Sequence, residues 1–270
     1  MTLESTLSYL AEMPEKPYFY LSEPPPGAAS RNTKGDRRTV TIHDARALAT
    51  RPSLDVEGFT LARHETSVEN LYDPERVRAG YYPEMEDLVR AATGAARVVA
   101  FDHNVRCAPL AERREHGAQA PVRYVHNDYT ESSGPQRVRD LFPAAEADRL
   151  LRHRFAVINV WKPIRHRVEE SPLGVCDARS LRMEDLVSTE LRYPDRLGEI
   201  YSVRFHPTHR WFYYSHMDAD EAMLLTCYDS DPGRARFTAH SAFDDPTSPP
   251  GAPPRESIEV RTLAFFAPRA

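Results

Sequence analysis

The feature that most constrains this 270-residue chain is a series of short runs rich in Val, Ile, Phe and Tyr, which begins near residue 98. Such runs, bounded by Pro, Gly and polar residues, are typical of β-strands. The eight runs are 98–106, 122–129, 154–164, 199–207, 209–217, 221–230, 235–243 and 256–266. A helical stretch, about 136–152, separates the second from the third. This arrangement predicts a mainly β protein with flanking helices, folded as a double-stranded β-helix, the cupin-like jelly roll.

The first part of the chain has a different pattern. Residues 38–66 contain two further strand-like runs, and residues 73–95 are predicted to be helical because they open with an Asp-Pro pair, a typical cap followed by a first-turn proline. A chain of this length suits one large domain. We therefore expect a single domain over residues 1–270, in which residues 1–95 pack on a jelly-roll core formed by 96–270.

Composition excludes several kinds of protein. The net charge is −5 and Arg is interleaved with Asp and Glu, so no nucleic-acid partner is expected. The cysteines Cys107, Cys176 and Cys227 are odd in number and lack CxxC spacing, which argues against a disulfide framework and favours the cytoplasm. The N-terminus does not resemble a signal peptide. No apolar stretch reaches the ~20 residues that a membrane span needs.

A candidate metal site lies in the second and seventh runs. His126 and Asp128 are two residues apart, so on a strand they share a face and can each offer one ligand to the same ion. His240 is the best third ligand, because the second and seventh strands of a jelly roll are neighbours. Two histidines and one carboxylate suit non-haem Fe(II) and leave positions for a co-substrate and O2. His216 and Asp218 form a rival pair, but only one clear run separates them from His240.

A candidate co-substrate site follows His240 by fifteen residues. Arg255 and Ser257 share a strand face, and a guanidinium with a hydroxyl suits the far carboxylate of 2-oxoglutarate. The Pro-rich stretch 246–254, between His240 and Arg255, is predicted to be a loop. By parity Arg261 shares this face and is a second candidate, although Glu259 could pair with it.

Three further residues are candidates for the walls of the site. Tyr124 shares a face with the predicted metal ligands, and Asn159 could hydrogen-bond the oxoacid end of the co-substrate. Trp161 could line the substrate pocket, or it could be an ordinary core residue. For Asn159 a structural role is equally open.

The remaining candidates concern the substrate. Arg106 and His103 lie on the first run, and Arg106 would suit a substrate carboxylate. His216 could line the pocket or simply fill space near its aromatic neighbours. For each of them a surface or packing role is the alternative.

Six stretches carry a resemblance to a known family. They are FDHNVR (101–106), VHNDYT (125–130), INVWKPI (158–164), PLGVCDARS (172–180), WFYYSHMDADEAMLLTCYDS (211–230) and PRESIEVRTLAFF (254–266). Together they resemble a family of Fe(II)- and 2-oxoglutarate-dependent oxygenases that includes the cephamycin 7α-hydroxylase component, a fungal gibberellin desaturase and a fungal enzyme that forms a meroterpenoid endoperoxide.

The resemblance implies a jelly-roll enzyme of specialised metabolism. It carries the iron ligands over to His126, Asp128 and His240, and the co-substrate arginine to Arg255. It implies oxidation of an unactivated C–H bond of a small molecule by hydroxylation, desaturation or oxidative cyclisation, and leaves a protein partner or a homodimer open. The alternatives are a non-haem iron oxidase that does not use 2-oxoglutarate and a non-catalytic jelly-roll partner protein.

Overall fold

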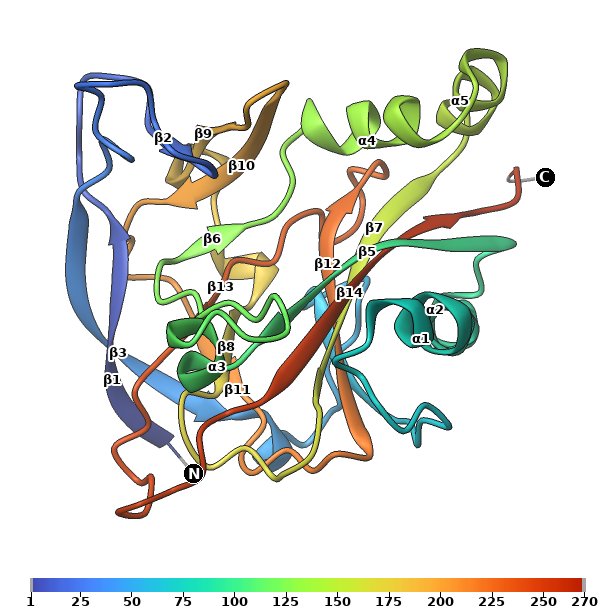
Figure 1. Ribbon diagram of the computed structural model, residues 1–270. Coiled ribbons are helices and arrows are strands. Elements are labelled where there is room, and N and C mark those ends of the chain that lie inside the picture. The colour runs from blue at the N-terminus through green and yellow to red at the C-terminus, as the bar shows by residue number, and fades with distance from the viewer. Residues whose placement is uncertain (1, 269–270) are drawn as a thin grey trace.

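The computed structural model describes residues 2–268, and within them the strands form two sheets (Figure 1). The larger sheet contains, in spatial order, β1 (Thr2–Leu10), β3 (Gly35–Asp44), β11 (Trp211–Tyr213), β8 (Leu173–Cys176), β13 (His240–Ala242), β6 (His126–Asn127), β10 (Leu197–Val203), β9 (Leu186–Arg192) and β2 (Tyr18–Tyr20). The smaller sheet contains β4 (Phe59–Arg63), β12 (Glu221–Asp229), β7 (Phe155–Pro163), β14 (Ser257–Phe265) and β5 (Arg97–Arg106).

The chain winds between the two sheets as in a jelly roll. Strands β5, β6, β7 and β8 alternate between the smaller and the larger sheet, and β11, β12, β13 and β14 do so in the opposite order. The double-stranded β-helix predicted from the sequence is therefore confirmed. The central pair β7 and β14 is antiparallel and in register along nine residues, with Ser257 opposite Pro163 and Phe265 opposite Phe155.

One predicted barrel strand was wrong. The fourth strand of the jelly roll is the four-residue β8, whereas the predicted run 199–207 contributes β10, which forms a hairpin with β9 and extends the larger sheet beyond β6. The N-terminal β1 was not predicted. It pairs with β3, which joins the larger sheet through parallel pairing with β11.

Helices cover the smaller sheet and one end of the barrel. They are α1 (Pro74–Arg76), α2 (Tyr82–Thr93), α3 (Ala108–Glu112), α4 (Ser133–Leu141) and α5 (Ala144–Leu151), with a π-helical turn, Val77–Tyr81, between the first two. The helix predicted over 73–95 begins where the Asp73 side chain accepts hydrogen bonds from Glu75 and Arg76, and it ends at Gly94, whose φ of 69° suits glycine. Figure 1 shows α2 beside β14 and β5. No described helix is long and apolar enough to cross a membrane.

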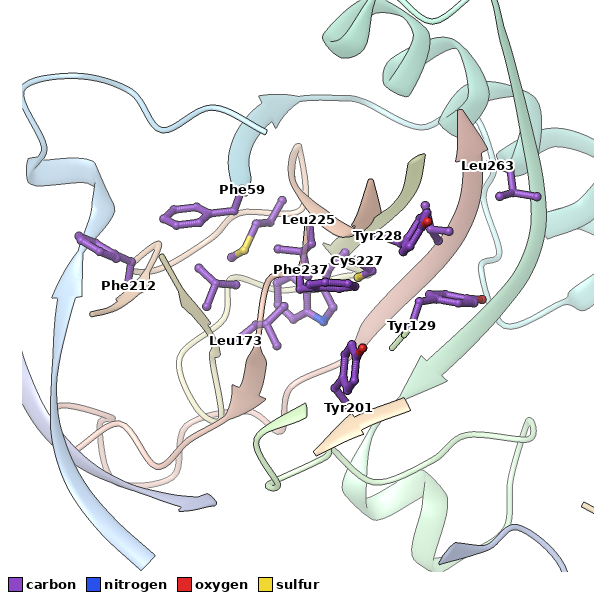
Figure 2. Packing of buried hydrophobic residues seen from close by; sticks show 14 of the residues in the cluster. Phe59, Tyr129, Leu173, Tyr201, Phe212, Leu225, Cys227, Tyr228, Phe237 and Leu263 are labelled. Carbon is purple, nitrogen blue, oxygen red and sulfur yellow. The ribbon is translucent and has the colours of Figure 1, made fainter. Parts of the chain in front are cut away.

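The hydrophobic core has two main parts, one on each side of the smaller sheet. Between the sheets, Phe237 lies near Leu225 and Cys227, while Tyr129 and Tyr201 lie toward one end of the cluster (Figure 2). On the other side, a second cluster of buried apolar residues joins this sheet to α2. Both faces of the smaller sheet are therefore buried, and the side chains on its inner face are enclosed by the barrel.

Candidate metal centre

Strands β6 and β13 bring the three predicted ligands together. His126 and His240 are directly opposite each other in the antiparallel pair, and their ring centroids are 4.4 Å apart. Oδ1 of Asp128 lies 3.4 Å from Nε2 of His126 and 3.9 Å from Nε2 of His240. The three donor atoms lie within 4.8 Å of one another. This spacing lets one ion accept a bond from each, since Fe–ligand distances are close to 2 Å.

Backbone carbonyls orient both histidines. Nδ1 of His126 lies 2.8 Å from the carbonyl oxygen of Tyr124, and Nδ1 of His240 lies 2.9 Å from that of Thr238. A carbonyl only accepts, so each Nδ1 must carry the proton and each Nε2 presents its lone pair to the site. Burial, together with the neighbouring His126, lowers the pKa of His240 to about 4. His240 is therefore neutral at pH 7, as a metal ligand must be.

The second oxygen of Asp128 is held by the smaller sheet. Nδ2 of Asn159 and Nε of Arg261 each donate to Oδ2 of Asp128 at 2.8 Å. Burial acts to raise the pKa of this carboxyl, but the Arg261 guanidinium and the two histidines hold it well below its usual range. Asp128 is therefore ionised, and its Oδ1 remains available as a single ligand atom.

The guanidinium of Arg261 is already occupied by carboxylates. In addition to Asp128, its guanidinium contacts Asp102 at 2.9 Å and Glu259 at 3.3 Å. Three carboxylates therefore surround one cation, whose pKa they raise well above its ordinary value. A guanidinium with these partners has little capacity for a further carboxylate, which favours Arg255 over Arg261 as the predicted co-substrate arginine.

A small cavity, here called the inner cavity, extends from the two histidines into the barrel. Its volume is about 20 Å³. It is lined by Arg106, Val122, His126, Trp161, Leu173, His240, Ser241, Ala242, Arg255 and Glu259. Arg255 is 3% exposed, and its Nη1 donates to the carbonyl oxygen of Ser171 at 2.5 Å.

Two donors near the inner cavity have no protein partner. Among residues 2–268, nothing accepts a hydrogen bond from the buried Nε of Arg255, and the buried Oγ of Ser257 has no partner either. Burial and the nearby Arg106 lower the pKa of Arg255, although it stays charged at neutral pH. An unpaired buried donor is costly, so these atoms fit a carboxylate brought by a ligand.

A larger cavity, here called the cleft, opens on the other side of the metal ligands. Its volume is about 1340 Å³, and it reaches His126 and Asp128 at its floor. Its walls come from β2, the β9–β10 hairpin, α4 and the segment between β5 and β6. Cavities of several hundred Å³ accommodate drug-sized molecules. The predicted metal ligands therefore border both cavities, which share Arg106, Val122 and His126 in their linings.

Two predicted substrate residues lie away from the cleft. His103 is opposite Val260 on the outer face of the smaller sheet, where its Nδ1 lies 2.9 Å from the hydroxyl oxygen of Tyr82. His216 is exposed in the turn after β11, at a φ of 47°, and lines neither cavity. Neither histidine lines a described cavity, because strand parity turns His103 outward and a turn carries His216 to the surface, so their positions do not support the predicted substrate roles.

Trp161 and Tyr124, predicted as walls of the site, line different cavities. Trp161 is buried against the inner cavity, with the Arg255 guanidinium 5.4 Å from its ring, so it is not placed to contact a substrate in the cleft. Tyr124 lines the cleft, where its ring meets Phe19 edge to face, and does not line the inner cavity. Trp161 therefore lies at the inner cavity and Tyr124 at the cleft, and their roles toward ligands stay predictions.

Sequence reasoning missed two residues that shape the site. Asn127 is fully buried, donates to the carbonyl oxygens of Tyr129 and Cys227, and accepts from the amide of Thr238. It thereby ties β6 to the segment that orients His240. Glu259 was considered only as a partner of Arg261, yet it also lines the inner cavity. Two signals were available in the sequence. Asn127 is a polar residue between two predicted metal ligands, and Glu259 shares a strand face with Arg255 and Arg261.

The fold and the site together define a class of protein. A facial set of two histidines and one aspartate suits non-haem Fe(II), and the narrow cavity beside it is lined by Arg255, whose Nε has no hydrogen-bond partner among the described residues. A jelly roll with this centre is typical of 2-oxoglutarate-dependent oxygenases.

Comparisons with known proteins agree. The family model described as "Oxidoreductase/YMDC permease-like domain" matches residues 7–265. The hydroxylase/desaturase efuI of Hormonema carpetanum is 34% identical over 289 residues, which cover 98% of this chain and 95% of that protein. The Fe(II)/2-oxoglutarate-dependent dioxygenase nvfI of Aspergillus novofumigatus is 34% identical over 258 residues, which cover 92% of this chain and 90% of that protein.

A solved structure gives the same result. The iron and alpha-ketoglutarate-dependent endoperoxidase NvfI superposes with a TM-score of 0.86 at 31% identity, over 99% of both chains. Alpha-ketoglutarate is another name for 2-oxoglutarate. The chain therefore belongs to the family of Fe(II)/2-oxoglutarate-dependent oxygenases that contains these fungal hydroxylase/desaturases and this endoperoxidase, and the predicted relationship to an endoperoxide-forming oxygenase is confirmed.

Proposed function

We propose that His126, Asp128 and His240 bind Fe(II), and that Arg255 and Ser257 bind the far carboxylate of 2-oxoglutarate within the inner cavity. The observation that carries this proposal is a pair of buried donors without partners among the described residues, Arg255 Nε and Ser257 Oγ, of which Arg255 lines the same cavity as the two histidines. Fe(II) with 2-oxoglutarate and O2 supplies the oxidant that breaks an unactivated C–H bond, and succinate and CO2 are released. The substrate is a small molecule of specialised metabolism, as the relatives' activities indicate.

The protein's own residues orient, enclose and separate the reactants. Asn159 and Arg261 hold Oδ2 of Asp128, so that the carboxylate contributes one oxygen and leaves room at the metal for other ligands. The buried Trp161 forms a dry wall beside Arg255. A dry wall strengthens the Arg255–carboxylate attraction, since water no longer screens it. Contact between Asn159 and the oxoacid end of 2-oxoglutarate stays a prediction; its Oδ1 is buried and has no partner among the described residues.

The assignment is tested by anaerobic titration with Fe(II) and 2-oxoglutarate, following the visible charge-transfer band of the chelate. Wild type should develop the band. His240→Ala should not, and Arg255→Gln should need about 100-fold more 2-oxoglutarate, because a charge-assisted pair in a buried site is lost. Arg90→Gln, which removes an exposed arginine of α2, is the matched control and should behave as wild type.

The outcomes separate the three candidate functions. A non-haem iron oxidase that does not use 2-oxoglutarate would bind iron and give no band. A non-catalytic jelly-roll protein would bind no iron. If Arg90→Gln and Arg255→Gln shift the titration equally, Arg255 does not bind the co-substrate.

The proposal also covers the domain organisation, the cellular compartment and the oligomeric state of the chain. Strands from residues 1–95 join both sheets of the core, which supports one domain over residues 1–270. The three cysteines are free and buried, which supports a reducing compartment such as the cytoplasm. A homodimer or a protein partner remains open, and the molecular mass in solution tests it.

A further inference from the structure

Two guanidinium groups at the inner cavity have no carboxylate partner. Arg106 and Arg255 both line this cavity, and among residues 2–268 neither guanidinium forms an ion pair within 4.0 Å, although Glu259 attracts both and Glu170 accepts from the backbone amide of Arg255. The third arginine of the region, Arg261, is by contrast paired with Asp128, Glu259 and Asp102. Buried and half-buried charges are normally paired, so an unpaired one indicates a missing anion.

The proposed co-substrate neutralises only one of these two arginines. 2-Oxoglutarate has two carboxylates, of which one belongs with the keto oxygen at the metal and the other with Arg255. Arg106 then still lacks an anion. Its one side-chain hydrogen bond within the described residues is from Nη1 to the carbonyl oxygen of Ala120, at 2.9 Å, so Nε and Nη2 remain available.

Arg106 differs from Arg255 in its access. It lies at the end of β5, opposite Ser257, and it lines the cleft as well as the inner cavity. Other cations of the cleft are paired or lie at its rim. Lys16 contacts Glu190 and Glu199, for example, and Arg196 is exposed. Arg106 is thus a cation without an ion pair among the described residues that lines both the cleft and the inner cavity, together with the metal ligand His126.

The lining of the cleft is mixed, and among its charged residues stand two exposed leucines. Leu197, 69% exposed, and Leu21, 52% exposed, both line the cleft, on the β9–β10 hairpin and just after β2. Phe19 and Tyr124, whose rings meet edge to face, line the same cleft, as Arg106 does. Leucines that are largely exposed single out a binding surface when they gather around a cavity.

We infer that the substrate is an apolar small molecule that carries an anionic group, and that Arg106 binds this group while the apolar part lies against Leu21, Leu197, Phe19 and Tyr124. The inference rests on the proposed binding of 2-oxoglutarate by Arg255. Arg106 is then a residue that determines specificity, because a neutral analogue leaves its guanidinium unpaired.

A pair of fluorescent probes tests this inference without knowledge of the substrate. 8-Anilinonaphthalene-1-sulfonate has an apolar body and an anionic group, and N-phenyl-1-naphthylamine has the same body without the anion. Both are titrated anaerobically into the enzyme loaded with Fe(II) and saturating 2-oxoglutarate. Arg106→Gln should weaken binding of the sulfonate at least about tenfold and change binding of the neutral probe by less than about threefold.

Arg196→Gln is the matched control, since it removes an exposed arginine that lines the same cleft. It should alter binding of the sulfonate less than about threefold, because an exposed cation is screened by solvent. Displacement of the sulfonate by decanoate or by decyl phosphate then distinguishes a carboxylate from a phosphate as the preferred group.

Three results would overturn the inference. The first is an equal loss of affinity for both probes in Arg106→Gln. The second is that Arg106→Gln and Arg196→Gln weaken binding of the sulfonate equally. The third is a loss of 2-oxoglutarate affinity in Arg106→Gln as large as in Arg255→Gln, which would assign Arg106 to the co-substrate. Failure of the proposed function is seen separately, as a wild-type enzyme that develops no chelate band before any probe is added.

Discussion

The two faces of the smaller sheet are both buried, yet their chemistry differs. The outer face of β14 presents Ile258, Val260 and Ala264 to the cluster beneath α2, and all are fully buried. The inner face of the same strand presents Ser257, Glu259 and Arg261 toward the metal ligands. Successive residues of one strand therefore lie in an apolar core and in a charged site.

The difference shows what each face does for the protein. Burial of apolar side chains on the outer face stabilises the fold by roughly 25 cal/mol per Å². Burial of charges on the inner face costs free energy unless each charge is paired. Glu259 illustrates this cost, since burial and the neighbouring Asp128 raise its pKa. The inner-face charges serve to position and bind ligands. The apolar burial on the outer face supplies the stability that offsets their cost.

The largest effect is expected where a single inner-face cation supports several carboxylates. Arg261→Leu leaves Asp128 and Glu259 buried without their common partner, and unfolding in urea should show a loss of about 3–5 kcal/mol. Adding Glu259→Leu removes one of the two stranded carboxylates and should recover at least about 1 kcal/mol. A loss below about 1 kcal/mol in the single variant would mean that the inner charges are not coupled in this way.

A smaller effect, on stability alone, is expected on the outer face. The test is Val260→Ala. Val260 lies between Glu259 and Arg261 in the sequence, but its side chain points into the apolar cluster. Removing two buried methyl groups should cost about 2 kcal/mol in urea unfolding. The 2-oxoglutarate titration should stay within about twofold of wild type, since no contact with the site is lost. A larger change in that titration would show that the two faces are not independent.

The comparison also explains what the sequence could predict. Runs 154–164 and 256–266 are β7 and β14 almost residue for residue, because a strand buried on both faces needs a continuous β-branched and aromatic pattern. The pairing of His126 with His240 follows from jelly-roll winding. These features depend on strand order and parity, which a sequence expresses directly.

Other features depend on tertiary contacts and were missed. The fourth barrel strand, β8, has only four residues, so the longer run 199–207 seemed the better candidate. The segment TLESTLSYL forms β1 because β3 pairs with it along its whole length. The burial of Glu259 could not be predicted either, since a charge on a strand is usually solvated and only the enclosing barrel makes this position internal.

The smallest effect concerns the exception on the outer face. Lys162 lies opposite Ile258 and is 1% exposed, and its Nζ donates to the carbonyl oxygen of His64. Burial lowers the pKa of Lys162 to about 8. The unfolded chain keeps this proton up to about pH 10.4, so above pH 8 it binds more protons than the folded protein. The destabilisation caused by the buried charge is therefore present in full below pH 8 and is relieved as the pH rises.

Lys162→Met tests this sign by comparison with wild type. From pH 7.5 to 9.5, the unfolding free energy of wild type should rise by roughly 1–2 kcal/mol relative to that of the variant. The difference between the two unfolding free energies removes the contributions of tyrosines and other groups that titrate in both proteins. The groups that face Lys162 do not interfere in this range, because burial lowers the pKa of His64 and hydrogen bonds from Ser67 and Thr66 keep that of Glu84 low. If the difference in unfolding free energy does not change with pH, the pKa of Lys162 is not lowered in the folded protein. The outer face would then accommodate a cation without cost.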